Sequence, residues 1–158
     1  VDILANGNLD YAPSILSKLD FVIGSVHSRF SMNEREMTSR LLKALDNPHL
    51  HLLGHPTGRL INQRQPYIFD LKRIAEKAAE RNISMEVNSY PTRLDLRDHH
   101  IHSAIGIGAK ICINTDSHAP DQLGNIIYGI GQARRGWAEK KHVLNTQPWK
   151  KFSSFLQR

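Results

Sequence analysis

The stretch with the clearest capacity for chemistry is Ile-Cys-Ile-Asn-Thr-Asp-Ser-His at 111–118, an apolar run that ends in polar residues. Asp116 and His118 are two residues apart, and in an extended backbone such residues point to the same side. We therefore expect both side chains to aim at one point just past the end of a buried strand. A carboxylate oxygen and an imidazole nitrogen at one point suit a divalent metal such as Mn²⁺, Fe²⁺ or Zn²⁺. For this motif alone, the alternative is a solvated strand end with an aspartate in the turn.

Two more histidines, His27 and His55, each follow a short apolar run that is typical of a strand. In parallel α/β proteins, functional groups collect at the carboxyl ends of the strands. His27, His55 and His118 would then share one edge of a sheet with Asp116. A single histidine in such a place is more often a hydrogen-bonded structural residue, but three at one edge favour a metal site. No role is assigned to His49, His51, His99, His100, His102 and His142.

The elements that must position these residues alternate between apolar runs and helical patterns. Strands are predicted over residues 1–5, 21–25, 50–54 and 83–88, and in the run that begins at Ile111. Helices are predicted over residues 11–19, 31–45, 70–81, 97–107, 126–134, 138–144 and 148–156. Ser31 and Glu34 form a capping-box pattern at the start of the second helix. Repeated alternation of this kind indicates parallel β/α units, either in an open sheet or in part of a barrel.

Length and composition indicate one globular domain with room for a buried core, because the chain has 158 residues. The 21 Lys and Arg residues exceed the 15 Asp and Glu residues, which gives a net charge of +6. That charge suits nucleic acid or phosphorylated substrates, and it suits simple solubility equally well. The lone cysteine, Cys112, excludes a disulfide framework, and no apolar run approaches the ~20 residues of a membrane span. With no signal peptide recognised, we expect a cytoplasmic protein that does not contact a membrane.

Several polar residues flank the predicted strand ends. Arg59 and Arg64 lie in the loop after His55, and Arg93 follows the strand predicted at 83–88. An arginine beside a metal cluster can hold a phosphate with two parallel hydrogen bonds, although a loop arginine in solvent is the alternative. Glu86 lies within that same predicted strand and needs a partner if it is buried.

Four motifs together resemble the PHP (polymerase and histidinol phosphatase) superfamily. They are Gly-Ser-Val-His-Ser at 24–28, Leu-Gly-His-Pro-Thr-Gly-Arg at 53–59, Glu-Val-Asn at 86–88 with Arg-Leu-Asp-Leu at 93–96, and Ile-Asn-Thr-Asp-Ser-His at 113–118. Ala-Arg-Arg-Gly-Trp at 133–137 and Val-Leu-Asn-Thr at 143–146 resemble the PHP domain at the C-terminus of bacterial and archaeal family-X DNA polymerases in particular. The resemblance extends over nearly the whole chain.

The resemblance implies the C-terminal portion of a distorted seven-stranded β/α barrel of TIM-like form. It implies a cluster of up to three Mn, Zn or Fe ions, with His27, His55, Asp116 and His118 as ligands. Arg59 would contact a phosphate, and no catalytic residue is implied beyond the ligands. The implied activity is phosphoester hydrolysis, which in these polymerases is 3′→5′ exonuclease and DNA-end processing. The implied partners are DNA 3′ ends or another phosphoester substrate, and polymerase domains in the same parent chain.

The chain departs from the family pattern at its start. A His-x-His pair, a later Asp and His, and a Glu directly before Val-Asp-Ile would all lie upstream of Val1. We therefore expect residues 1–158 to form the C-terminal portion of a single PHP-like domain, as a fragment of a longer protein. Such a fragment would bind metal weakly and would need the missing half for catalysis. Unpaired strand edges would favour association between chains.

Two other functions remain open from the sequence. One is a small-molecule phosphatase of the histidinol-phosphate type, which the polymerase-like motifs at 133–137 and 143–146 disfavour. The other is a non-catalytic module that supports a neighbouring polymerase domain, which the retained motif residues disfavour. The identity of the metal, the exact substrate and the oligomeric state stay open as well.

Overall fold

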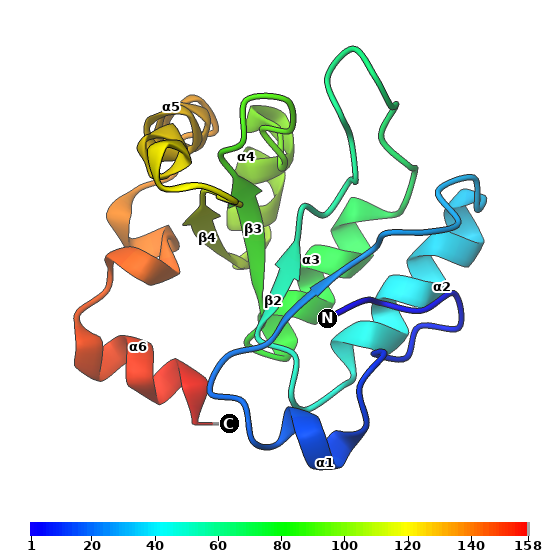
Figure 1. Ribbon diagram of the computed structural model, residues 1–158. Coiled ribbons are helices and arrows are strands. Elements are labelled where there is room, and N and C mark those ends of the chain that lie inside the picture. The colour runs from blue at the N-terminus through cyan, green and yellow to red at the C-terminus, as the bar shows by residue number, and fades with distance from the viewer. Residues whose placement is uncertain (158) are drawn as a thin grey trace.

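The computed structural model describes residues 1–157, and a parallel sheet of four strands lies at its centre (Figure 1). In spatial order the strands are β1 (Ile23–Ser25), β2 (Leu52–Gly54), β3 (Ser84–Asn88) and β4 (Lys110–Asn114). Each strand pairs in parallel with the next one along the chain. Because neighbouring strands run the same way, their carboxyl ends lie at one edge of the sheet. The predicted α/β class with parallel strands is confirmed.

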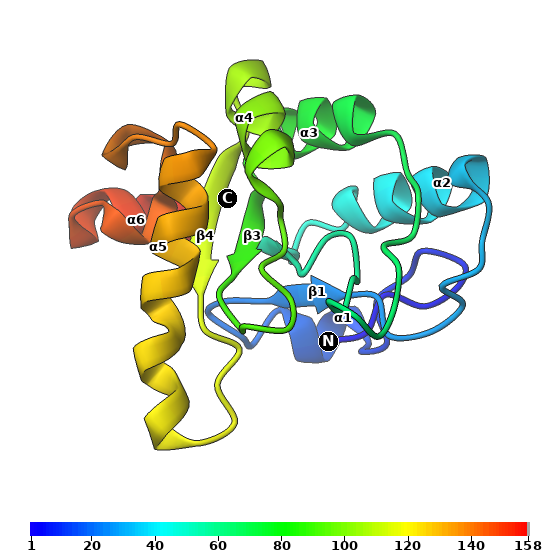
Figure 2. The ribbon, with the colours of Figure 1, turned by 90° about the horizontal axis from the view of Figure 1, so that it is seen from above.

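The helices of the described residues are α1 (Pro13–Leu16), α2 (Glu34–Leu45), α3 (Leu71–Glu80), α4 (Asp98–Ile107), α5 (Ile126–Arg135) and α6 (Trp149–Leu156). Helices α2, α3 and α4 connect successive strands and cover one face of the sheet, whereas Phe155 of α6 packs with Leu52 and Cys112 in a second, smaller apolar cluster. Figures 1 and 2 show α2, α3 and α4 in a row behind the sheet, with α5 and α6 beyond β4. Contacts join α2 to α3, α3 to α4 and α4 to α5. Within residues 1–157, no helix has both the length and the apolar character needed to cross a lipid bilayer.

The main core lies between the sheet and this row of helices. The helices contribute buried residues at helical spacing, namely Met37, Leu41 and Leu45 from α2, Ile74 and Ala78 from α3, and Ile101 and Ala104 from α4. All residues of β2 and β3 are buried, as expected for central parallel strands. Full burial of each large apolar side chain contributes about 1.5–3 kcal/mol, which holds the strand ends in fixed relative positions.

The beginning of the chain differs from the predicted strand at 1–5. Backbone hydrogen bonds join Ile3 to Ser25 and Ser25 to Val1, so residues 1–3 run beside the outer edge of β1. The segment then turns at Gly7, whose φ of +83° lies in the left-handed region that glycine tolerates. The predicted strand is therefore a pair of isolated bridges and ends after Ile3.

Two predicted helices also differ in detail. The capping box of α2 uses Asn33 and Glu36, because the Asn33 side chain accepts from the Glu36 amide at 3.0 Å and Glu36 accepts in return at 3.1 Å. The Ser31 and Glu34 pattern is thus shifted by two residues. The helix predicted at 138–144 is instead two short 3₁₀ turns, Lys140–His142 and Leu144–Thr146. There, His142 accepts a hydrogen bond from the Glu139 amide.

The outer edge of β4 is also bonded within the chain. Asn145 donates to the carbonyl of Ile113 at 2.8 Å and accepts from its amide at 3.2 Å. A parallel bridge joins Ile111 to Val143. Together with residues 1–3 beside β1, these contacts satisfy part of each outer strand edge of the sheet.

Candidate metal centre

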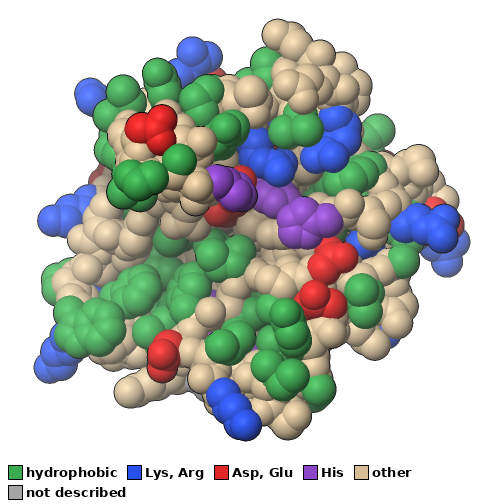
Figure 3. Space-filling model, viewed as in Figure 1, with side chains coloured by type: hydrophobic (Ala, Val, Ile, Leu, Met, Phe, Trp, Pro, Cys, Tyr) green, Lys and Arg blue, Asp and Glu red, His purple; other side chains and the backbone are tan. Residues whose placement is uncertain are grey.

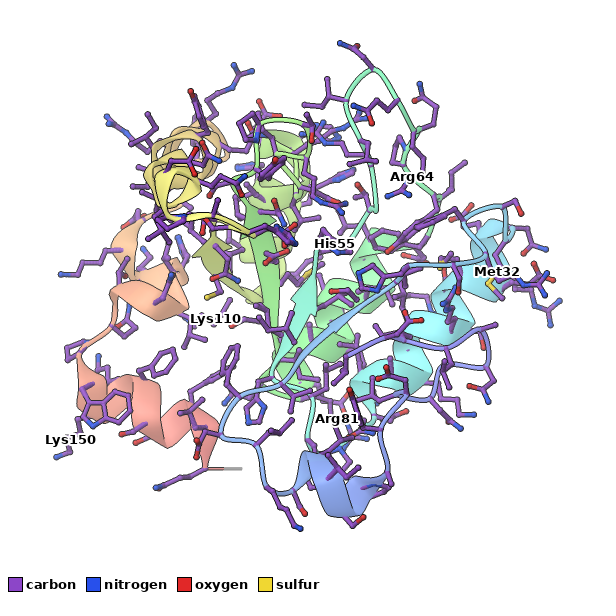
Figure 4. All side chains as sticks on the ribbon, in the orientation of Figure 1. Met32, His55, Arg64, Arg81, Lys110 and Lys150 are labelled. Carbon is purple, nitrogen blue, oxygen red and sulfur yellow. The ribbon has the colours of Figure 1, made fainter. Side chains whose placement is uncertain are left out.

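A pocket of about 500 Å³ opens at the carboxyl ends of the strands and contains three of the four predicted ligands. His27, His55 and Asp116 all line it, together with Glu86 and Asn114. Figure 3 shows histidine side chains gathered near the middle of this face, between acidic and basic side chains. In Figure 4, His55 lies in the centre of the molecule at the end of β2, while Lys110 and Lys150 lie toward α6.

The sheet register explains why these residues meet. Ser25 pairs with Gly54, so His27 and His55 leave neighbouring strands at the same level. Their rings are 5.1 Å apart between centroids and nearly perpendicular, at 75°. Asp116 follows β4 by two residues and reaches the same pocket from the other side of β3. The structure therefore brings together side chains from three separate strand ends.

His55 is a buried, neutral imidazole. Burial lowers its pKa to about 4, and the positive charges of Arg93 and His27 act in the same direction. At neutral pH the ring is therefore uncharged and keeps one unprotonated nitrogen. Its Nδ1 atom is buried and forms no hydrogen bond with the described part of the chain. The backbone of His55 has a φ of +27°, a conformation that non-glycine residues adopt rarely and that is found disproportionately at functional sites.

His27 has a carboxylate partner that the sequence did not single out. The Nδ1 atom of His27 is 3.3 Å from Oδ1 of Asp2, and the His27 side chain is 55% exposed. An ionised carboxylate only accepts hydrogen bonds, so Nδ1 of His27 is the donor in this contact and Nε2 is the ring nitrogen left for another partner. Histidine ligands of metals commonly have such a carboxylate behind them. The sequence carries no local signal for Asp2, which is placed near His27 by its parallel bridge with Ser25.

Asp116 and His118 do not converge as expected from an extended backbone. The strand ends at Asn114, and Asp116 has a φ of +53°, so the alternation of side chains does not continue to His118. His118 is exposed and is not among the described residues that line the pocket. Its Nδ1 atom is 2.8 Å from the backbone oxygen of Asp116.

The arginine beside the candidate ligands is Arg93. Its Nε atom lies 3.3 Å from Oδ2 of Asp116, and its side chain is 17% exposed. Arg59, the predicted phosphate contact, instead donates to the backbone oxygens of Arg93 and Leu94. Arg64 donates to the Gly58 oxygen and lies 3.9 Å above the Phe30 ring, on the long loop that Figure 4 shows above His55. The guanidinium groups of Arg59 and Arg64 thus stabilise loops, because they donate hydrogen bonds to backbone oxygens of the chain.

Glu86 is buried beneath the pocket and has the partners that its burial requires. Its carboxylate accepts from the His55 amide at 2.5 Å, from Asn88 at 3.2 Å and from Asn114 at 3.0 Å. Burial raises the pKa of Glu86, whereas these hydrogen bonds lower it.

Cys112 is a buried thiol in β4. Burial raises its pKa to about 12 and keeps it protonated. This agrees with its interpretation as a small apolar residue.

The donor types at this pocket fit a divalent ion. Two imidazoles and a carboxylate line it, and one buried imidazole nitrogen lacks a hydrogen-bond partner within residues 1–157. Nitrogen and oxygen donors of this kind bind Mn²⁺, Zn²⁺ and Fe²⁺. Within the same described residues, no three His, Cys, Asp or Glu side chains are grouped closely enough to hold an ion. The donors present are therefore suitable in kind and incomplete as a cluster.

Comparison with known proteins gives relatives along the full chain. The chain is 42% identical over all 158 residues to the DNA polymerase/3'-5' exonuclease PolX of Bacillus subtilis, and it spans 28% of that protein. Two proteins named "Probable phosphatase", from Clostridium acetobutylicum and Clostridium novyi, are 32% and 29% identical to it over 78% and 75% of its length. The chain spans 52% and 50% of these two relatives. No protein-family model matches the chain.

Proposed function

We propose that this chain belongs to the PHP superfamily and contributes to a metal-dependent phosphoesterase with 3′→5′ exonuclease or DNA-end-processing activity. The observation that carries the proposal is the meeting of His27, His55 and Asp116 in one pocket at the carboxyl ends of parallel strands. Similarity over the whole chain to a protein named as a polymerase and 3'-5' exonuclease supports DNA as the substrate. Polymerase domains in the same parent chain would be the partners.

In this proposal, His27, His55, Asp116 and His118 hold one or more Mn, Zn or Fe ions. Further donors would come from residues outside this chain, because its relatives are longer and its own donors are incomplete as a cluster. The four-stranded sheet would be the C-terminal portion of a seven-stranded β/α barrel. A bound ion supplies Lewis acidity, which activates water and neutralises charge on phosphoester oxygens.

The protein's own side chains would prepare the pocket for a phosphate. The neutral imidazole of His55 provides a nitrogen donor without a competing proton at neutral pH. Arg93 places a positive charge beside Asp116, and we assign the phosphate contact to Arg93 because the donors of Arg59 bond to the backbone. The net charge of +6 favours a polyanionic strand, with an affinity that falls as salt rises.

A small-molecule phosphatase is the second candidate. Similarity to the two clostridial proteins named "Probable phosphatase" favours it. The two candidates differ in the group attached to the phosphate, which is a nucleotide chain in one case and a small alcohol in the other.

The deciding experiment compares substrates with the full-length parent protein in Mn²⁺, because the proposal takes the remaining metal donors from outside this chain. We expect release of nucleotides from the 3′ end of single-stranded DNA, abolished in the Asp116→Ala variant. Hydrolysis of histidinol phosphate without nucleotide release would establish the phosphatase instead. Metal binding without hydrolysis of either substrate would contradict both enzymes and leave a structural module. Asn145→Ala serves as a control, because Asn145 bonds to β4 without lining the pocket.

A further inference from the structure

A hydrogen bond and an ion pair reach the Asp116 carboxylate at the same oxygen. Asn88 Nδ2 is 3.1 Å from Oδ2 of Asp116, and Arg93 Nε is 3.3 Å from that atom. Among the hydrogen bonds of residues 1–157, none reaches Oδ1 of Asp116. Since Asp116 lines the pocket, the oxygen left for a ligand in the pocket is Oδ1.

Asn88 is held in one orientation by its own contacts. It is fully buried at the end of β3, and its Oδ1 atom accepts from the Tyr90 amide at 3.0 Å. Its Nδ2 atom donates to Glu86 as well as to Asp116. Its backbone exchanges two hydrogen bonds with Asp95, which fixes the strand end as well. An amide is the side chain of this shape that can accept from one neighbour and donate to two carboxylates.

These contacts join the two sides of the pocket. The Glu86 carboxylate accepts from the His55 amide at 2.5 Å and from Asn88 at 3.2 Å. One continuous path therefore runs from the backbone of His55, through Glu86 and Asn88, to the carboxylate of Asp116. The path crosses from the end of β2 to the loop after β4, so it fixes the spacing of two candidate ligands from different strands.

We propose that Asn88 is the positioning residue of this site, because it holds Asp116 by Oδ2 and so presents Oδ1 to a divalent cation. The inference rests on the proposed function, which makes Asp116 a metal ligand. Groups that orient metal ligands typically change metal affinity by about 10- to 100-fold when removed. Loss of Asn88 should therefore weaken cation binding even where the fold is retained.

The test measures Mn²⁺ affinity by electron paramagnetic resonance for the full chain and for Asn88→Ala. Asn145→Ala is the matched control, because Asn145 also makes two hydrogen bonds beside β4 and does not contact Asp116. We expect Asn88→Ala to weaken Mn²⁺ binding by about 10- to 100-fold, and Asn145→Ala to leave it unchanged. The visible absorption of bound Co²⁺ should shift in Asn88→Ala alone, since it reports on the ligand arrangement.

Urea unfolding of each variant separates a lost fold from a displaced ligand. Asn88→Ser is a milder second variant, because its hydroxyl can still accept from the Tyr90 amide but is too short to reach Asp116. Equal Mn²⁺ affinity in the wild type and in a folded Asn88 variant would overturn the positioning role while leaving the proposed function intact. Absence of Mn²⁺ binding by the wild type would overturn both.

Discussion

Asp95 should make the stability of this protein depend on pH in an unusual direction. It is fully buried in the loop after β3, and its carboxylate accepts from the Thr57 amide at 2.9 and 3.2 Å. Burial raises its pKa from 3.8 to about 6, although the Thr57 bonds and the charge of Arg59 act in the opposite direction. This carboxylate joins the loop after β3 to the loop that carries His55, so its protonation bears on the candidate site.

The sign and size of the effect follow from this shift. The folded state binds the proton more tightly than the unfolded chain does, so protonation stabilises the fold. The contribution is fully present below about pH 4 and is lost as the pH rises through the folded pKa of about 6. Each pKa unit corresponds to about 1.4 kcal/mol, which gives a loss of about 3 kcal/mol across this window.

The assay is urea unfolding, followed by circular dichroism, of the wild type and of Asp95→Asn between about pH 4 and pH 7. The amide cannot ionise, so the free energy of unfolding of the wild type should fall relative to this variant by about 3 kcal/mol as the pH rises. Asp46→Asn is the control. Hydrogen bonding to Lys77 lowers the pKa of Asp46, so the contribution of this carboxylate to stability is lost only below about pH 4. The difference in the free energy of unfolding between Asp46→Asn and the wild type should therefore stay constant between about pH 4 and pH 7. A constant difference for Asp95→Asn would refute the reasoning.

Two further predictions concern local structure, and urea unfolding measures both. Asn33→Ala removes the cap of α2 and should lower the free energy of unfolding by about 1 kcal/mol, whereas Ser31→Ala should change it little. A larger loss for Ser31→Ala than for Asn33→Ala would show that Ser31 caps the helix, as the sequence alone predicts. Gly54→Ala would place a Cβ atom 2.3 Å from Oγ of Ser25, directly before His55, and should cost about 1–3 kcal/mol. Gly131→Ala in α5 meets open space and should not destabilise, so equal effects of the two alanines would contradict the packing argument.

The sequence predicted the parts of the site that depend on strand ends. Apolar runs placed His27 and His55 directly after buried strands, and the parallel order of the sheet brings such ends together. Hydrophobic burial determines both features, and burial is readable from a pattern of residue types. The same reasoning explains why Cys112 was correctly interpreted as a buried apolar residue.

The details that the sequence did not predict depend on backbone turns and on contacts between distant residues. The left-handed backbone of Asp116 breaks the alternation that was expected to direct His118, and no residue type there requires it. Arg59 and Arg93 are both loop arginines, and only the folded loops show which one bonds to the backbone and which lies beside Asp116. Asp2 reaches His27 through pairing of residues 1–3 with β1, a contact that local patterns do not specify.

The central claim is that this pocket binds a divalent metal through His55 and Asp116. The most direct measurement is elemental analysis of the full-length parent protein after loading with Mn²⁺ or Zn²⁺ and gel filtration. The account predicts that the wild type retains metal and that Asp116→Ala and His55→Ala lose it, while Asn145→Ala behaves as the wild type. Absence of retained metal in the wild type, or equal retention in Asp116→Ala, would contradict the account.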